Sequence, residues 1–488
     1  MAIRTVYLET MGCQMNSLDS ELVLGQLRAQ GYKPVRDPTT ADVVLINTCS
    51  VRDHAEQKAF SRLGSLKRSK SLRPQMIVGV IGCMAERDPD GILRKTPHVD
   101  LVCGPGELNK IPAMIDEVLE TRGRLVALSE THSRRNSLLK RASEFDSVEA
   151  LDLSRSAGLP ERVHQAYIRI QRGCDKFCTF CVVPFTRGPE RCRPPDRIVG
   201  EARMLADRGA IEVTLLGQTV NSYAYPEHGT TVHLSDLLER VSQVAGMERV
   251  RFVTSFPGDF TDDLLHAMRD LPKVCAYLHI PVQSGSDAVL DRMNRCYTVG
   301  RFVDLLDRAR EIVPSISLAT DFIAGFCGET DEEFQASCDL VKRSRFKNIF
   351  CFKYSPRPGT VADKRLADDV PDAVKRQRNV ALLKLQEGVS LEDNQRWIGQ
   401  TVEVLVEGYS KAALRSQEAE QSRGAEVGWR RSDQFVGRTR GDHIVVFPGA
   451  EPHVGTLQNV RIRSVTALTL FGEIVNRVPS PPGEPTHA

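Results

Sequence analysis

The chain has 488 residues, of which 41% are hydrophobic and 26% charged, and its formal net charge is +2. This length exceeds what one hydrophobic core organises and predicts about two to four domains, while the small net charge confines any nucleic-acid contact to a local basic patch. No apolar run reaches the roughly 18 residues of a membrane span, and no apolar signal core follows the first methionine, so we expect a cytoplasmic protein without membrane contact.

The first 125 residues alternate apolar runs with helical patterns. Continuous apolar runs are typical of buried parallel strands, and three occur here, at Thr5–Leu8, Val43–Ile46 and Ile77–Ile81. A helix is expected from about Asp19 to Gln30, where Gly31 ends it. Residues 1–125 are therefore predicted to form an α/β domain with a parallel sheet, followed by a polar linker over residues 126–164.

A cysteine follows each of these three strands: Cys13, Cys49 and Cys83. Because the carboxyl ends of parallel strands meet at one edge of a sheet, the three thiols are expected to converge. Gly12 and Gly82 leave room beside them for a bulky group. A lone cysteine is most often a small buried hydrophobe, but an odd total of 13 cysteines in a chain without a secretory signal favours metal ligation over disulfides.

The segment 172–181 carries three more cysteines, Cys174, Cys178 and Cys181, with the spacing C-x3-C-x2-C. A structural zinc site needs four ligands, usually as two C-x2-C pairs, whereas thiolate-rich sites suit iron–sulfur clusters. Three ligands to a four-iron cube leave one iron free to bind another molecule. Phe177 and Phe180 are expected to shield the loop from water. A zinc knuckle is the alternative.

Between about Gln165 and Tyr354, six apolar runs alternate with amphipathic patterns that predict helices. These patterns include Ile198–Arg208, Leu234–Val244, Arg301–Glu311 and Asp331–Arg343. The predicted strands are Ala166–Ile170, Glu212–Leu216, Arg249–Val253, Ala276–Ile280, Ile316–Ile323 and Asn348–Tyr354. Six βα repeats predict a parallel sheet, either open or an incomplete (βα)6 barrel, within a domain spanning 165–393. In such folds the chemistry lies at the carboxyl ends of the strands, and the cysteine loop directly follows the first strand.

The other strand ends carry glycines, amides and hydroxyls. Glycine permits close approach of a ligand to the backbone, and amides supply directional hydrogen bonds. The polar residues at any single strand end can equally be those of an ordinary βα turn. Their presence at every strand end predicts a ligand site, lined by Gly217, Gln218, Asn221, Ser255, His279, Gln283 and Asp321.

Residues 394–475 change to alternating short strands, predicted at Thr401–Val406, His443–Phe447, Asn459–Val465 and Thr469–Ile474. This pattern is typical of a small all-β barrel, similar to the TRAM domain, an OB-like RNA-binding module. Residues 411–434 read as an inserted polar loop and 476–488 as a disordered tail. The arginines of this segment can simply form a charged surface exposed to water. Alternatively they bind phosphates, and we predict a phosphate-binding surface made of Arg430, Arg431, Arg438, Arg440, Arg461 and Arg463.

Two sets of motifs carry a family resemblance. The C-x3-C-x2-C loop resembles the signature of the radical S-adenosylmethionine superfamily. The segments 12–16, 47–52 and 82–85 resemble the N-terminal signature of the methylthiotransferases within it, and 186–188, 215–221 and 354–360 match the same family. Segments 13–16 and 51–58 are most similar to the branch that modifies isopentenylated adenosine at position 37 of the tRNA anticodon loop.

The resemblance implies two 4Fe–4S clusters. Cys174, Cys178 and Cys181 would hold the one that binds S-adenosylmethionine, which is cleaved to a radical that takes the hydrogen atom from C2 of adenine. Cys13, Cys49 and Cys83 would hold an auxiliary cluster carrying the sulfur that becomes the methylthio group, with a second S-adenosylmethionine as methyl donor. It also implies tRNA as substrate, an electron donor such as flavodoxin or ferredoxin, and a monomer.

Two positions depart from the family pattern: Cys192 stands where serine is usual, and Cys327 where proline is usual. Both triads are complete without them, so neither is expected to be a ligand. Three alternatives remain open from sequence: a methylthiotransferase acting on threonylcarbamoyladenosine, one acting on a ribosomal protein, and a non-catalytic metal-cluster RNA-binding protein.

Overall fold

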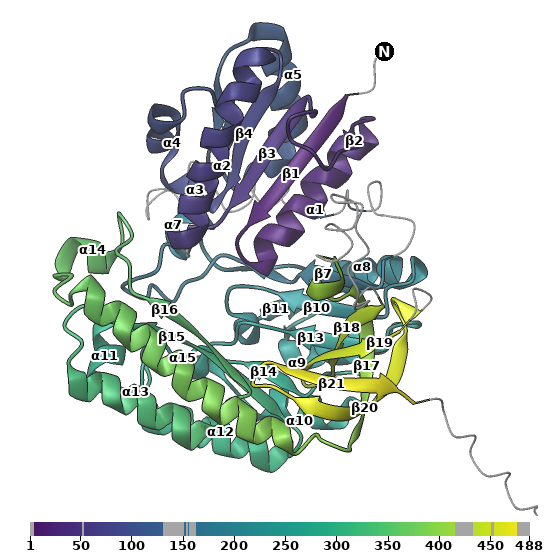
Figure 1. The fold of residues 1–488 in the computed structure, drawn as a ribbon, viewed down its shortest axis with the longest axis vertical. Helices are drawn as coiled ribbons and strands as arrows, with labels where there is room; N and C mark the ends of the chain where they lie inside the picture. Colours follow the sequence, from purple (N-terminus) through teal and green to yellow (C-terminus); the bar gives the residue numbers. More distant parts are fainter. Residues whose placement is uncertain are drawn as a thin grey trace, which may run out of the picture.

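The structure is a computed structural model that describes residues 4–50, 53–129, 151–152, 155, 163–414, 433–449 and 453–475 (Figure 1). An N-terminal α/β domain lies above a larger central domain, and a small β-barrel packs beside the latter. Most of the predicted linker, most of the predicted insertion and the predicted tail lie outside the described residues. None of the described helices is long and apolar enough to cross a membrane.

The N-terminal domain is built on six parallel strands in the order β2-β1-β3-β4-β5-β6. The strands are β1 (Thr5–Met11), β2 (Lys33–Pro34), β3 (Val43–Thr48), β4 (Ile77–Gly82), β5 (Leu101–Cys103) and β6 (Leu125–Ala127). The helices are α1 (Gln14–Ala29), α2 (Asp53–Leu72), α3 (Cys83–Arg87), α4 (Pro89–Lys95) and α5 (Ile111–Thr121). Helices α1 and α5 cover one face and α2 to α4 the other, which is why β3 and β4 are buried along their whole length.

The three strands predicted in this domain are confirmed as β1, β3 and β4. Helix α1 begins five residues earlier than expected, because Cys13 takes the N-cap position with extended backbone. Strands β2, β5 and β6 were not predicted, since runs of two or three residues are too short to show a period.

The central domain holds the six predicted parallel strands, β7 (Gln165–Arg169), β10 (Glu212–Leu216), β13 (Arg249–Phe252), β14 (Tyr277–His279), β15 (Ser317–Ala324) and β16 (Asn348–Lys353). They form two hydrogen-bonded sets, β13-β10-β7 and β14-β15-β16, joined by a parallel bridge between Val250 and Val274. The strands follow one another in chain order, which is the arrangement of the predicted partial barrel.

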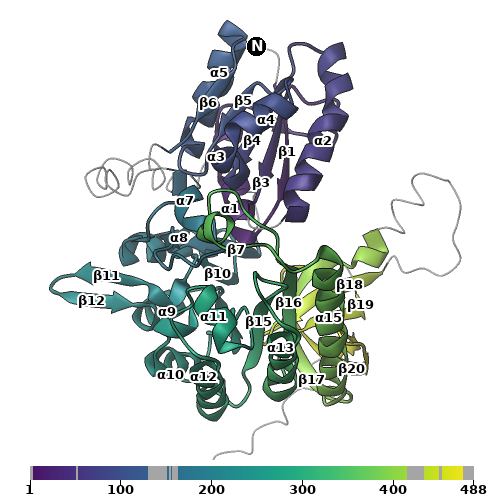
Figure 2. The same cartoon turned by 90° about the vertical axis from the view of Figure 1, so that its left-hand side faces the viewer.

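Helices surround this barrel (Figure 2). The predicted ones are confirmed as α8 (Pro195–Asp207), α9 (Leu234–Ser242), α12 (Val299–Ile312) and α13 (Asp331–Ser344). The structure adds α7 (Val183–Thr186), α10 (Asp262–Asp270), α11 (Asp287–Arg292), α14 (Val361–Arg365) and the long α15 (Asp372–Gln395), which packs against β16. Two hairpins complete the domain, β8 (Gln171–Arg172) with β9 (Arg191–Cys192), and the projecting β11 (Ala224–Glu227) with β12 (Thr230–His233).

The C-terminal domain is a closed five-stranded barrel in the order β17-β18-β19-β21-β20. Its strands are β17 (Thr401–Tyr409), β18 (Gln434–Thr439), β19 (Ile444–Pro448), β20 (Leu457–Val465) and β21 (Thr469–Ile474). Four were predicted; β18 was missed because its first residue was assigned to the polar insertion and Gly437 and Arg438 interrupt its apolar alternation.

This barrel packs against the amino ends of the central strands. Arg249, the first residue of β13, is fully buried and donates to the carbonyl oxygen of Arg438 at 2.9 Å and to the carboxylate of Glu403 at 2.7 Å. Arg251 donates to the carbonyl oxygen of Thr439 at 2.7 Å. The C-terminal barrel therefore lies at the end of the central strands opposite to the cysteine loop.

Candidate functional site

The three N-terminal cysteines lie together at the carboxyl edge of the parallel sheet. Cys13 caps α1, Cys49 follows β3, and Cys83 begins α3 directly after β4. The thiols of Cys13 and Cys49 share a hydrogen bond, and Cys83 is close enough to interact electrostatically with Cys13. The predicted convergence of these side chains is present in the structure.

Two asparagines hold this edge in place. The Asn16 amide oxygen accepts from the Cys13 thiol at 3.1 Å, and its amide nitrogen donates to Asn47 at 2.9 Å. A Cβ on Gly12 would lie 2.7 Å from the Asn16 oxygen, and one on Gly82, whose φ is +93°, would lie 2.3 Å from the Asn47 oxygen. The two glycines therefore make room for the asparagines, and room for a cluster beside them stays a prediction.

The triad has unequal proton affinities. The hydrogen bond with Cys49 and the positive charge of Arg187 lower the pKa of Cys13 to about 6. Burial raises the pKa of the Cys83 thiol, although Arg187 acts in the opposite direction. Arg187 belongs to the central domain, so a cation from one domain acts on the thiols of the other.

The central cysteine loop is held by backbone contacts on two sides. The Cys174 amide donates to the Gly188 carbonyl at 3.2 Å, and the Thr179 amide to the Met293 carbonyl at 3.0 Å. Gly173 adopts φ +73°, where a Cβ would lie 2.0 Å from the Pro189 carbonyl oxygen, so this position requires glycine. The loop is thereby clamped between segments 188–189 and 292–295.

Arg295 is a buried residue of this site that the sequence did not single out. It donates to the Cys178 sulfur at 3.3 Å, and its other groups bind the Tyr297 hydroxyl and the Pro281 carbonyl. Phe180 is half-buried and packs against Phe326 with the ring centroids 6.3 Å apart. Phe177 is 36% exposed, so the expectation that it too shields the loop is wrong.

The donor chemistry fits iron–sulfur clusters. Burial raises the pKa of Cys174 to about 11 and that of Cys181 to about 12, so iron must displace the protons of these thiols. In the part of the chain that the structure describes, no three His, Cys, Asp or Glu side chains surround a point suited to a single ion. A four-iron cluster places each thiolate on a different iron, which keeps the ligands farther apart than those of zinc.

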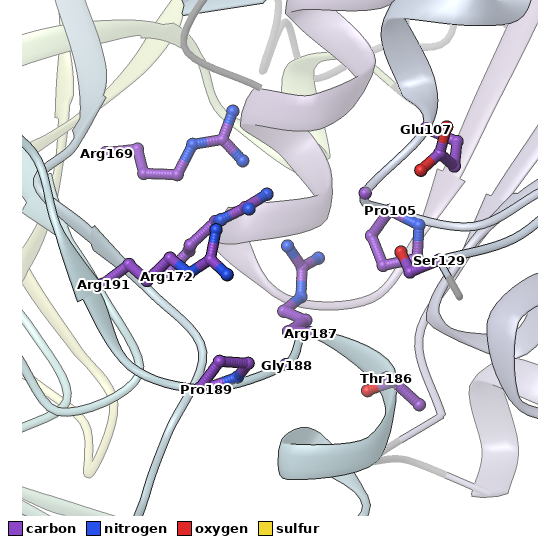
Figure 3. A pocket seen from close by; sticks show the side chains of 11 residues that line it. Pro105, Glu107, Ser129, Arg169, Arg172, Thr186, Arg187, Gly188, Pro189 and Arg191 are labelled. Carbon is purple, nitrogen blue, oxygen red and sulfur yellow. The ribbon is translucent and has the colours of Figure 1, made fainter. Parts of the chain in front are cut away.

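A cleft lies between the two domains, lined by residues of both (Figure 3). The N-terminal domain contributes Pro105, Gly106, Glu107 and Ser129, and the central domain contributes Arg169, Arg172, Thr186, Arg187, Gly188, Pro189 and Arg191. Arg187 reaches the N-terminal triad while the next residue, Gly188, bonds Cys174. The cleft wall thus connects the two predicted cluster sites.

Buried ion pairs join the domains beside this cleft. Asp19 of α1 is fully buried between Arg169 at 3.0 Å and Arg187 at 2.8 Å. Arg169 also binds Asp152 at 2.6 Å. Further ion pairs extend this network, in which the arginines and the carboxylates are equal in number. The other members are Glu21, Arg155, Arg193 and Glu201. Such a network is stable only while every charge keeps its partner.

The residues predicted to line a ligand site fall into two groups at the carboxyl ends of the central strands. In the first, Asn221 exchanges two hydrogen bonds with the backbone of Phe256, at 2.9 and 2.6 Å, so its amide is engaged. The Ser255 hydroxyl is buried and has no hydrogen-bond partner among the described residues. Gly217 faces Gln171, whose amide oxygen would lie 2.9 Å from an added Cβ, and the neighbouring Gln218 is half-buried.

In the second group, His279 and Asp321 form a pair on adjacent strands with Nε2 and Oδ1 2.9 Å apart. Gln283 adopts φ +76°, and its backbone N–H donates to the carbonyl oxygen of Asp321 at 2.8 Å. The Ser255 amide donates to the His279 carbonyl at 3.0 Å, which connects the two groups. Which of these side chains touch a ligand stays a prediction.

Three further cysteines need to be distinguished from the ligands. Cys103 ends β5 beside Ile81 of β4, so a strand-end position is not by itself diagnostic; this thiol packs in the apolar core, and burial raises its pKa. Cys192 lies opposite Gln171 in the β8–β9 hairpin, and burial raises its pKa to about 11. Cys327 is buried beside Tyr354, and burial raises its pKa.

Cys192→Ser and Cys327→Ala are each expected to retain the full iron content of the parent protein. Neither thiol belongs to a triad, and each substitution changes the side-chain volume little. Iron and acid-labile sulfide per chain, measured after anaerobic reconstitution, provide the check. A loss of about half the iron in either variant would overturn the ligand assignment.

Comparisons with known proteins agree with this arrangement. Residues 5–104 match the group described as uncharacterized protein family UPF0004, and residues 168–341 match the radical SAM superfamily. Over 471 residues the chain is 49% identical to the tRNA-2-methylthio-N6-dimethylallyladenosine synthase of Rhodopirellula baltica, covering 96% of this chain and 95% of the relative. The synthase of the same name from Moorella thermoacetica is 39% identical over 477 residues, covering 97% and 99%.

Among solved structures, the radical S-adenosylmethionine methyltransferase TsrM from Kitasatospora setae is similar with a TM-score of 0.49 and 15% identity, covering 72% of this chain and 73% of that one. The cysteine loop at the mouth of a partial barrel, together with the superfamily match, defines a radical S-adenosylmethionine enzyme. More particularly, the chain belongs to the family of tRNA-2-methylthio-N6-dimethylallyladenosine synthases.

Proposed function

We propose that this protein replaces the hydrogen at C2 of N6-isopentenyladenosine in the tRNA anticodon loop with a methylthio group. The observation that carries the proposal is a short segment in the wall of the interdomain cleft, Arg187 and Gly188, which lies beside a cysteine of each triad. One triad serves hydrogen removal and the other sulfur delivery, and the proximity of the two sites lets one bound base meet both.

Cys174, Cys178 and Cys181 would hold one 4Fe–4S cluster, and Cys13, Cys49 and Cys83 the other. Bound together with S-adenosylmethionine, these groups supply the one-electron chemistry that removes a hydrogen atom too weakly acidic for any protein base. The chain itself orients the ligands: Arg295 holds Cys178, and Asn16 holds Cys13. His279, Asp321, Ser255 and Gln283 are the proposed contacts of S-adenosylmethionine, together with Gly217, Gln218 and Asn221.

The substrate is tested by nucleoside analysis. Anaerobically reconstituted protein is incubated with S-adenosylmethionine, reductant and tRNA that carries isopentenyladenosine, and the digested nucleosides are separated by mass spectrometry. Conversion of isopentenyladenosine to its 2-methylthio form is expected. Conversion of threonylcarbamoyladenosine instead, or of neither nucleoside, would contradict the proposal.

We also propose the cytoplasm as the compartment, a flavodoxin or ferredoxin as electron donor, and a monomeric enzyme. A tRNA substrate is met in the cytoplasm, and one-electron chemistry needs a one-electron donor.

The proposed RNA-binding module is the barrel of β17 to β21, which resembles an OB-like fold. The backbone carbonyls of Arg438 and Arg440 accept from Arg249 and Arg251 of the central domain. Their side chains pair within the barrel, Arg438 with Asp442 at 2.9 Å and Arg440 with Glu403 at 3.8 Å.

The remaining described arginines of the predicted RNA surface, Arg461 and Arg463, lie on β20, and both are exposed. Arg461 has no ion-pair partner among the described residues, and Arg463 pairs with Glu473. Arg430 and Arg431 lie outside the described residues. Strand β20 is therefore the part of the barrel that we propose for phosphate contacts.

Arg461→Gln and Arg463→Gln are each expected to weaken tRNA binding and to reduce the slope of log affinity against log salt by about one unit. The measurement is a tRNA titration at several salt concentrations, with Arg269→Gln on α10 as an exposed control. Deleting the whole barrel is a poorer test, since it would remove the barrel partners of Arg249 and Arg251 and expose the face of the central domain that the barrel covers. Unchanged slopes in both variants would place the RNA contacts elsewhere.

A further inference from the structure

Arg187 enters the N-terminal cysteine site from the central domain. It directly follows α7, which packs against α3, the helix that begins with Cys83. Its charge acts on both Cys83 and Cys13, and its side chain is only 5% exposed. Figure 3 shows the side chain extending from its loop into the space between the domains.

The position of this cation is determined by both domains. Asp19 of α1 accepts from the guanidinium at 2.8 Å on the N-terminal side. On the central side, the next residue, Gly188, accepts from the amide of Cys174 at 3.2 Å. A single short segment therefore lies beside one proposed ligand of each triad, and a movement of either domain would displace the guanidinium from Cys83.

We propose that Arg187 is a positioning residue that stabilises the extra negative charge of the reduced N-terminal cluster and so sets its reduction potential. This inference rests on the proposed function only in assigning a cluster to Cys13, Cys49 and Cys83. A cluster bound by thiolates gains negative charge on reduction, and hydrogen bonds or cations at its sulfurs raise its potential. In a site shielded from water the effect of one guanidinium is strong.

A purely structural role, in which Arg187 only joins the domains through Asp19, makes a different prediction. Arg169 provides the matched control, because it binds the other oxygen of the same carboxylate at 3.0 Å and its remaining partner is Asp152. If docking alone matters, the loss of either arginine has the same consequence. If the contact with Cys83 matters, only Arg187 affects the cluster.

The test is a redox titration of the N-terminal cluster followed by electron paramagnetic resonance. It is carried out in full-length protein with Cys174→Ala, so that only this cluster gives a signal. Arg187→Gln is expected to lower the midpoint potential, Arg187→Lys to lie between it and the parent, and Arg169→Gln to match the parent. Equal potentials in all four proteins, or equal shifts for Arg187→Gln and Arg169→Gln, would overturn the proposal.

A second measurement applies to variants in which the N-terminal cluster assembles poorly and gives too little signal for a titration. Iron is counted in the same substitutions made in protein with both triads intact. Loss of about half the iron in Arg187→Gln but not in Arg169→Gln supports the contact with the N-terminal cluster, whereas loss in both variants assigns Arg187 to domain docking alone. Neither readout involves tRNA, so a failure here is distinct from a failure of the methylthiolation assay.

Discussion

Cys174→Ala is expected to abolish cleavage of S-adenosylmethionine, whereas Cys49→Ala is expected to spare at least part of that cleavage and to abolish methylthio insertion. The two cysteines belong to different triads in different domains, and each triad has its own supporting contacts: Arg295 for one, Asn16 and Asn47 for the other. Loss of one cluster therefore leaves the fold around the other intact. Each variant is expected to retain about half of the parent iron.

Cleavage is measured as 5′-deoxyadenosine formed without tRNA, and insertion as methylthiolated nucleoside formed with it. Cys103→Ala and Cys275→Ala are the controls, because both thiols are buried and lie outside the triads. If either control lost half the iron, or if Cys49→Ala abolished cleavage while Cys174→Ala did not, the assignment of the triads would be wrong.

Asp19→Asn is expected to lower the free energy of unfolding by about 3–5 kcal/mol. The asparagine keeps the shape of the side chain but removes the charge that faces Arg169 and Arg187, so two buried guanidinium groups lose their shared countercharge. Since the pair joins α1 to the central domain, the loss also weakens the contact between the domains.

The measurement is urea unfolding of anaerobically purified protein followed by circular dichroism, where the midpoint shifts at constant slope. Asp116→Asn is the control: Asp116 also pairs with an arginine, Arg4 at 3.3 Å, but both side chains are at least half exposed. That change is expected to cost about 0–1 kcal/mol. Equal effects of the two substitutions would show that the buried network contributes little to stability.

The sequence alone predicted the elements with a strong period. Buried parallel strands are continuous apolar runs, so β3, β4 and β10 were recognisable, and the cysteines that follow such strands could be placed at one edge. The C-x3-C-x2-C loop needed no structure at all, since its ligands lie within eight consecutive residues. The six proposed cluster ligands therefore come from the sequence, and the structure brings each set together.

Sequence patterns did not predict the structure where an element is short, or where the position of a side chain depends on the partner of its charge. Strand β5 has three residues, and its terminal Cys103 has the same strand-end position as the proposed ligands although it packs in the core. Arg438 and Arg461 look alike in the sequence, yet the first lies in a domain interface and the second is exposed. Local periodicity encodes burial of apolar side chains, but it carries no information about the partner of a charge.

The sequence by itself thus determined the proposed ligand sets, the parallel sheets and the order of the predicted domains, because these depend on local patterning and on spacing along the chain. Only the tertiary structure decided that Arg187 of one domain lies beside the cysteines of the other, in the wall of the cleft between them. Asp19 lies 150 residues before Arg169 and 168 before Arg187. Contacts over such separations arise when whole domains pack together, and that packing is encoded in the complementary shapes and charges of their surfaces rather than in any single segment.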